Sequence, residues 1–112
     1  MIDVKIFQTS SGEYTGFQMS GHAGYAEYGQ DIVCAAVSAL VINAINSIDR
    51  YTEDDFNHSV DPDTGSVFFQ ITDRPASASS VLLLRSLILG LRGIQDEYGK
   101  KHIKIRLEKQ EG

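Results

Sequence analysis

The sequence lacks a second cysteine and has little positive charge. One cysteine, Cys34, cannot form an internal disulfide, which agrees with a reducing compartment. Fifteen acidic against ten basic residues give a formal net charge of −5. This balance argues against nonspecific binding to nucleic acid or to anionic membranes, because both depend on clustered Lys and Arg. We therefore predict no direct nucleic-acid binding, whereas a basic protein partner is compatible with the charge.

Long hydrophobic segments and targeting signals are also lacking. No apolar run approaches the roughly 20 residues that span a bilayer, and residues 1–8 do not have the basic, then apolar layout of a signal peptide. No linker, low-complexity tract or internal repeat is visible. We therefore expect a cytoplasmic protein without membrane association. With 112 residues, the chain is expected to form one domain over residues 1–112.

The sequence has no pattern typical of a metal or phosphate site. Cys34 and His22 lack a second pair of ligands at suitable spacing, while His58 and His102 fall on separate predicted strands. The glycines around His22 match neither a Walker nor a dinucleotide-binding fingerprint. We expect no metal and no cofactor.

The spacing of apolar residues predicts an α+β fold with elements in the order ββαββαβ. Alternating apolar residues predict strands that begin at Ile2 and at Tyr14, and further strands over residues 58–60, 67–71 and 102–108. Spacing of three and four predicts one helix capped by Asp31 and ending near residue 51, and another that begins at Ser77 or Ser79 and ends at Gly99. The run DPDTG at residues 61–65 is a strong hairpin turn. We expect a mostly antiparallel sheet covered by two helices.

The second predicted helix carries more apolar residues than one core face can use, namely Leu82, Leu83 and Leu89. A domain this small cannot bury that surface alone, so we expect a homodimer. The alternative is that loops cover part of this surface.

Cys34 lies three residues after Asp31, near the start of the first predicted helix. A thiolate is a better nucleophile than a thiol. The unpaired N–H groups and the positive dipole end of a helix N-terminus favour an anion there. The same N–H groups suit the oxyanion that forms when a peptide carbonyl is attacked. From the residue types alone, a cysteine near a helix start is more often a small core residue than a nucleophile.

His22 is the candidate acid–base partner. It lies twelve residues before Cys34, at the root of a glycine-rich segment that includes Gly21, Gly24 and Gly29. An imidazole there can activate the thiol and later protonate the leaving amine. With Tyr25 and Tyr28 between the glycines, the segment has the composition of a flap that orders over an extended peptide. The alternative is an ordinary surface loop that contains a histidine.

Two stretches of the sequence resemble the signature of the ribosomal-processing cysteine proteases of bacteria. The first is GHAG at residues 21–24, and the second is GQDIVCAAVSAL at residues 29–40. The resemblance implies that Cys34 is the nucleophile and His22 its general base and acid. It also implies the ββαββαβ-type fold, a homodimer and, as substrate, the N-terminal extension of large-subunit ribosomal protein number twenty-seven, cut after a Phe-containing motif.

Asp31 and Ser38 also belong to the family's motif. In one interpretation, Asp31 orients His22 as the third residue of a catalytic triad. In the other, it only caps the helix. Ser38 is one turn after Cys34 on the same helix face. Its hydroxyl hydrogen-bonds near the thiolate or shapes the substrate pocket, or it bonds back to the helix carbonyl at Cys34. The residues leave both pairs of alternatives open.

Two other functions compete with the protease. One is a noncatalytic ribosome-associated module in which Cys34 is a packed helix residue and the loop captures a peptide. The other is a thiol hydrolase that acts on a small acyl substrate. The sequence does not identify the residues of a Phe-binding pocket.

Overall fold

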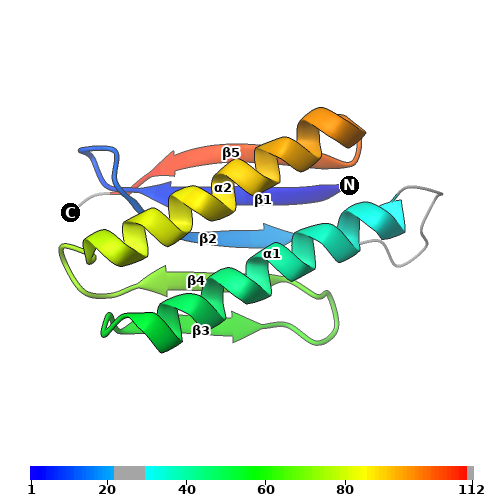
Figure 1. Cartoon of the computed structure of the whole chain (residues 1–112). Coiled ribbons are helices and arrows are strands. Elements are labelled where there is room, and N and C mark those ends of the chain that lie inside the picture. Colours follow the sequence, from blue (N-terminus) through cyan, green and yellow to red (C-terminus); the bar gives the residue numbers. More distant parts are fainter. Residues whose placement is uncertain (22–29, 111–112) are drawn as a thin grey trace.

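Five strands and two helices form the described part of the chain, in the predicted ββαββαβ order (Figure 1). The computed structural model describes residues 1–21 and 30–110, with Gln30 and Asp31 described by their backbone alone. The elements are β1 (Ile2–Gln8), β2 (Tyr14–Ser20), α1 (Gln30–Tyr51), β3 (Phe56–Val60), β4 (Val67–Ile71), α2 (Ala78–Tyr98) and β5 (Ile103–Lys109).

The strands form one mixed sheet in the order β3-β4-β2-β1-β5. Three of its pairings are antiparallel, and β1 pairs with β5 in parallel. Both helices lie on the same face of the sheet, and the C-terminal half of α1 passes over β4 and β3 (Figure 1). The predicted α+β fold, with a mostly antiparallel sheet covered by two helices, is confirmed.

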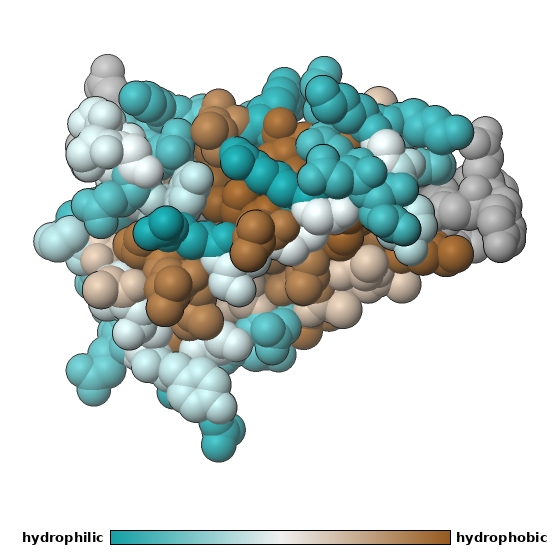
Figure 2. Space-filling view, turned by 45° about the horizontal axis from the view of Figure 1, so that its top comes forward, coloured by the Kyte–Doolittle hydropathy of each residue, from teal (hydrophilic) through white to brown (hydrophobic). Residues whose placement is uncertain are grey.

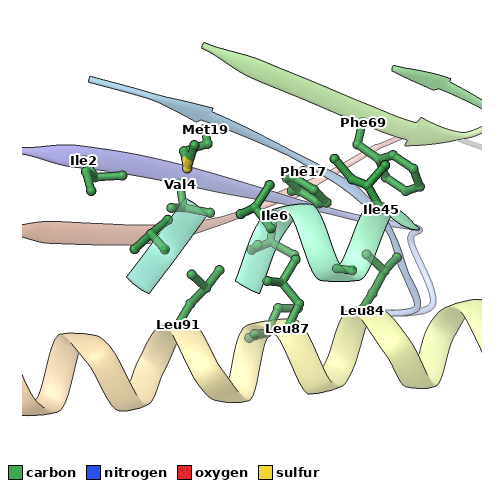
Figure 3. Packing of buried hydrophobic residues seen from close by; sticks show 14 of the residues in the cluster. Ile2, Val4, Ile6, Phe17, Met19, Ile45, Phe69, Leu84, Leu87 and Leu91 are labelled. Atoms are coloured by element: carbon green, nitrogen blue, oxygen red, sulfur yellow. The ribbon is translucent and has the colours of Figure 1, made fainter. Parts of the chain in front are cut away.

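The core lies between the sheet and the two helices. Leu84, Leu87 and Leu91 point from α2 toward the side chains of β1 and β2 (Figure 3), and Val33, Val37, Val41 and Ile48 of α1 are buried beside them. Phe17 and Phe69 stack across β2 and β4 with ring centroids 5.4 Å apart. The alternation in the strands and the spacing in the helices thus produce one continuous hydrophobic cluster.

Both helices are long and apolar enough to cross a membrane by length and composition alone, over Ile32–Tyr51 and Ala78–Tyr98. The expectation that no segment reaches this length is therefore wrong. The expectation failed because it considered only unbroken apolar runs. Scattered polar residues interrupt these runs, but the mean hydropathy of each helix stays as high as that of a membrane-spanning helix. Each helix directs one apolar face into the core, and the core helices of globular proteins pass the same test.

The ends of α2 agree with their sequence signals. Ser77 is the N-cap, and its side-chain oxygen accepts a hydrogen bond from the backbone N–H of Ser80 at 3.1 Å. Gly99 is the C-cap with a φ of 95°, a left-handed value that favours glycine. The predicted turn at residues 61–65 joins β3 to β4, where the Asp61 carboxylate accepts a hydrogen bond from the backbone N–H of Asp63 at 2.9 Å.

Candidate active site

Cys34 lies near the start of α1, where this helix faces the end of β2. The start of α1, the end of β2 and the turn between β3 and β4 all lie at the same end of the molecule (Figure 1). The Cys34 side chain is partly exposed and also packs against the hydrophobic cluster. Since helical side chains point back toward the N-terminus, the thiol is directed toward the first turn of α1.

An open groove of about 440 Å³ runs past this cysteine. Its two walls are α1 and the β3–β4 turn, and β2 forms its base. The lining residues are Met19, Cys34, Ala35, Ser38, Pro62, Asp63 and Gly65. A surface groove of this size, with one nucleophilic side chain in its wall, suits an extended peptide better than a small enclosed ligand.

A smaller cavity of about 20 Å³ lies beside the groove and shares four of its lining residues, Met19, Cys34, Ser38 and Gly65. Ser38 therefore lines the same two spaces as Cys34, one helical turn away. This position favours the interpretation in which Ser38 shapes the pocket next to the thiol.

The predicted partner of Cys34 is His22. His22 and the predicted flap residues Gly24, Tyr25, Tyr28 and Gly29 lie outside the described residues. The role of His22 as acid and base, and that of the segment as a flap, stay predictions.

Gly21 is the described residue at the root of that segment. It follows β2 with a φ of 78°, and a Cβ at this position would collide with the carbonyl oxygen of Met1. Both the left-handed backbone and the close approach require glycine where the chain leaves the sheet.

The start of α1 differs from its predicted position. The helix begins at Gln30, so Asp31 is its second residue and not the N-cap, and Cys34 is its fifth. Composition alone places a helix start only to within one or two residues. The side chain of Asp31 is not described, so its catalytic role stays a prediction.

The β3–β4 turn is the part of the groove that sequence analysis missed. Pro62, Asp63 and Gly65 were predicted as turn residues, and the sequence has no local signal that this turn lies opposite Cys34. The contact arises because β4 pairs with β2 on one side and with the edge strand β3 on the other. This non-local pairing brings the hairpin beneath α1.

The remaining two histidines lie far from each other in the sheet. His58 is in β3 and His102 directly precedes β5, and these strands form opposite edges of the sheet. The structure therefore does not bring these two together as ligands of one site.

An α+β fold with a cysteine in an open groove at the start of its first helix is the arrangement of a small thiol enzyme. Sequence comparison specifies the class: the family model described as "Cysteine protease Prp" matches residues 1–104. The chain therefore belongs to the Prp family of ribosomal-processing cysteine proteases.

Individual relatives agree with this assignment. The ribosomal processing cysteine protease Prp of Staphylococcus aureus is 32% identical over 100 residues, which cover 89% of this chain and 93% of the relative. The corresponding protein of Bacillus subtilis is 32% identical over 101 residues, covering 88% of this chain and 90% of the relative.

Solved structures are similar over almost the whole chain. The S. aureus protease in complex with a substrate peptide superposes with a TM-score of 0.89 at 30% identity, covering 96% of this chain and 100% of that one. The same protease with a covalently linked product peptide gives a TM-score of 0.85, with the same identity and coverage.

Proposed function

We propose that this protein is an endopeptidase that removes the N-terminal extension of large-subunit ribosomal protein twenty-seven, with Cys34 as nucleophile and His22 as general base and acid. The observation that carries the proposal is the groove of about 440 Å³ with Cys34 and Ser38 in its wall. It is supported by membership of the Prp family and by a relative of the same fold that binds a substrate peptide.

The proposed reaction has two stages. The Cys34 thiolate attacks the carbonyl carbon of the scissile peptide bond, and backbone N–H groups at the start of α1 stabilise the oxyanion. His22 donates a proton to the leaving amine, so that the C–N bond breaks and an acyl-thioester remains on Cys34. Water, deprotonated by His22, then hydrolyses the thioester and regenerates the thiolate.

Charge supports a basic substrate. The net charge of −5 favours encounter with a basic ribosomal protein, because complementary charge raises association rates. The Asp61 carboxylate does not line the groove, and within the turn it accepts hydrogen bonds from the backbone N–H groups of Asp63 and Thr64. Asp63 is an exposed acidic residue of the groove wall. It supplies negative charge where the peptide would lie.

Self-association is the second part of the proposal. Leu82 and Leu89 of α2 are 65% and 75% exposed. They border a surface groove of about 460 Å³ together with Tyr14, Arg85, Ser86, Ile88 and Arg92. Two copies of this face would cover apolar surface that a single chain leaves in water. We propose a homodimer through α2.

The test compares the protein with its Cys34→Ala form. Each is incubated with a peptide that spans the ribosomal extension, and the products are analysed by mass spectrometry. We expect one cut after the Phe-containing motif by the unaltered protein, and binding without cleavage by Cys34→Ala.

Two outcomes would contradict the proposal. Equal cleavage by both forms would eliminate Cys34 as nucleophile. Stable binding with no product from either form would support a noncatalytic assembly module in place of a protease.

A further inference from the structure

A second cavity lies farther along α1, between this helix and the hairpin of β3 and β4. Its volume is about 130 Å³. Four of its lining residues belong to α1, two to β3 and one to β4. They are Val41, Ile42, Ile45, Asn46, His58, Val60 and Val67. We call it the α1–β3 cavity.

The size and lining of the α1–β3 cavity suit one apolar side chain. Five of its seven lining residues are aliphatic, and Asn46 and His58 are the polar ones. An apolar cavity of about 150 Å³ in another protein stays dry and binds benzene. A space of about 130 Å³ is thus close to that needed for a phenyl ring or a branched aliphatic group.

The exposure of its lining also indicates an occupant. Ile42 is 58% exposed and Val60 is 53% exposed. Both border the cavity from opposite walls, one from α1 and one from β3. Exposed apolar groups that converge on a hollow are typical of ligand sites. Hydrophobic side chains also gather in patches on the helical side of the molecule (Figure 2).

The cavity continues the line of the groove that contains Cys34. On α1, Ser38 lines the groove, and Val41 and Ile42 line the cavity one turn later. On the hairpin, Gly65 lines the groove, and Val67 lines the cavity opposite its strand partner Val60. The same two walls therefore enclose both spaces, one after the other.

The helix sets the distance between them. Cys34 and Ile42 are eight residues apart in α1, which is about 12 Å at 1.5 Å per residue. An extended peptide advances about 3.3 Å per residue. A peptide whose scissile bond lies at Cys34 would therefore reach the cavity with a side chain about three or four residues away.

We propose that the α1–β3 cavity is a specificity subsite of the protease, which accepts an apolar side chain, aromatic or branched, about three or four residues from the scissile bond. This inference rests on the proposed role of Cys34 as nucleophile. The subsite contacts no reacting atom. It selects the substrate and fixes its register in the groove.

The experiment fills the cavity with a larger side chain and measures how the preference of the enzyme for apolar residues in its substrate changes. Peptides spanning the processed extension are made with each residue near the cut replaced in turn by Ala, and kcat/KM is measured for the unaltered protein and for Ile42→Trp. The control is Leu107→Trp, because Leu107 is an aliphatic residue of similar exposure, 49%, on the opposite edge strand β5.

For the unaltered protein and for Leu107→Trp, Ala at the subsite position should lower kcat/KM by about 10- to 100-fold, mainly through KM, as expected for the loss of an apolar group from a remote pocket. In Ile42→Trp this penalty should shrink to less than about threefold, with the other positions unaffected. An Ala scan with the same profile in Ile42→Trp as in the unaltered protein would overturn the subsite while leaving the protease proposal intact.

A binding measurement decides the inference independently of turnover. Fluorescence anisotropy compares the parent peptide with its Ala-substituted form on Cys34→Ala and on Cys34→Ala/Ile42→Trp. The subsite predicts that the parent peptide binds about tenfold more tightly than the Ala form to the first protein and equally to the second. The same preference in both would refute the subsite, whereas failure of the unaltered protein to cleave would refute only the proposed function.

Discussion

At the scale of single residues, Cys34 has two environments. Its side chain packs against the hydrophobic cluster and is also partly exposed in the groove wall. Packing on one side fixes the position of the thiol, and exposure on the other would admit a peptide to this proposed nucleophile. The position of this cysteine near a helix start was predictable from the sequence, because it depends on local spacing alone.

His22 is the first residue to test beside it. We expect His22→Ala to lower kcat by about 10²- to 10⁴-fold at neutral pH, since a positioned acid–base group contributes this much to a proton-transfer step. Steady-state cleavage of the extension peptide measures the effect, with His102→Ala as the control because His102 lines neither the groove nor the smaller cavity beside Cys34. A His22→Ala enzyme with an unchanged rate would remove the Cys–His pair.

Gly16 tests how tightly β2 and β4 approach each other. A Cβ at this position would overlap the backbone carbonyl oxygen of Phe69, which cannot move without breaking the pairing of these strands. We expect Gly16→Ala to lower the free energy of unfolding by about 1–3 kcal/mol or more, as overpacking does. Urea unfolding measures this loss.

Gly93 provides the matched control for that experiment. It lies within α2, and a Cβ there would meet no atom within 4 Å. Gly93→Ala should therefore raise the free energy of unfolding by up to about 1 kcal/mol, because alanine has the higher helix propensity. Equal destabilisation by both substitutions would contradict the steric explanation.

At the scale of elements, the start of α2 is tied to the connection between α1 and β3. The Asp54 carboxylate accepts hydrogen bonds from the Ser77 backbone N–H at 2.9 Å and from the Ser77 hydroxyl at 2.7 Å. Burial by itself would raise the pKa of Asp54, but these bonds and a side-chain hydrogen bond from Ser80 lower the pKa below its usual value of 3.8. The charged form is thus favoured in the folded protein.

The lowered pKa gives a pH dependence with a definite sign. A group whose pKa is lower in the folded state stabilises the fold above its unfolded pKa, and this contribution disappears as the pH falls through the folded value. We expect Asp54→Asn to be less stable than the unaltered protein at pH 7, with the difference shrinking below about pH 4. Thermal unfolding at a series of pH values measures it, and a difference that stays constant down to pH 2 would contradict the assignment.

The element order was predictable from hydrophobic periodicity, but the neighbours of each strand were not. Ser77, Gly99 and the turn at residues 61–65 mark boundaries because capping and turn chemistry are local. The parallel pairing of β1 with β5 joins residues about a hundred positions apart, such as Ile2 and Ile103. No local pattern encodes such a contact, and for the same reason the groove wall formed by Pro62 and Asp63 was missed.

At the scale of the whole molecule, the outward face of α2 is an apolar surface that the core does not use. The two helices share a core with the sheet, and at their crossing Gly90 lies so close to Leu40 that an added Cβ would be 2.8 Å from the leucine Cδ1. The outward side of α2 contributes nothing to this core, since Leu82 and Leu89 remain mostly exposed. In the proposed homodimer, these residues would be covered.

Leu89→Glu tests the dimer. The substitution removes the apolar contact of Leu89 and places a carboxylate in the proposed interface. Burying it is costly even beside Arg85 and Arg92, which line the same groove, so we expect the protein to become a monomer at micromolar concentration. Analytical ultracentrifugation measures the mass, with Leu107→Glu as a control on the opposite edge of the sheet. A Leu89→Glu protein of unchanged mass would place any interface elsewhere.

Cys34 and Ile42 lie on one uninterrupted helix, so the distance between them along the helix axis is fixed. Loops between two recognition points can stretch to accommodate substrates of different spacing, but a helix rises by a fixed 1.5 Å per residue. In the proposed protease, this fixed rise would set the number of substrate residues between the side chain bound in the α1–β3 cavity and the bond cut at Cys34. Inserting one residue between the two positions would rotate Ile42 by about a further 100° around the helix axis relative to Cys34, and the proposed register of cutting would be lost.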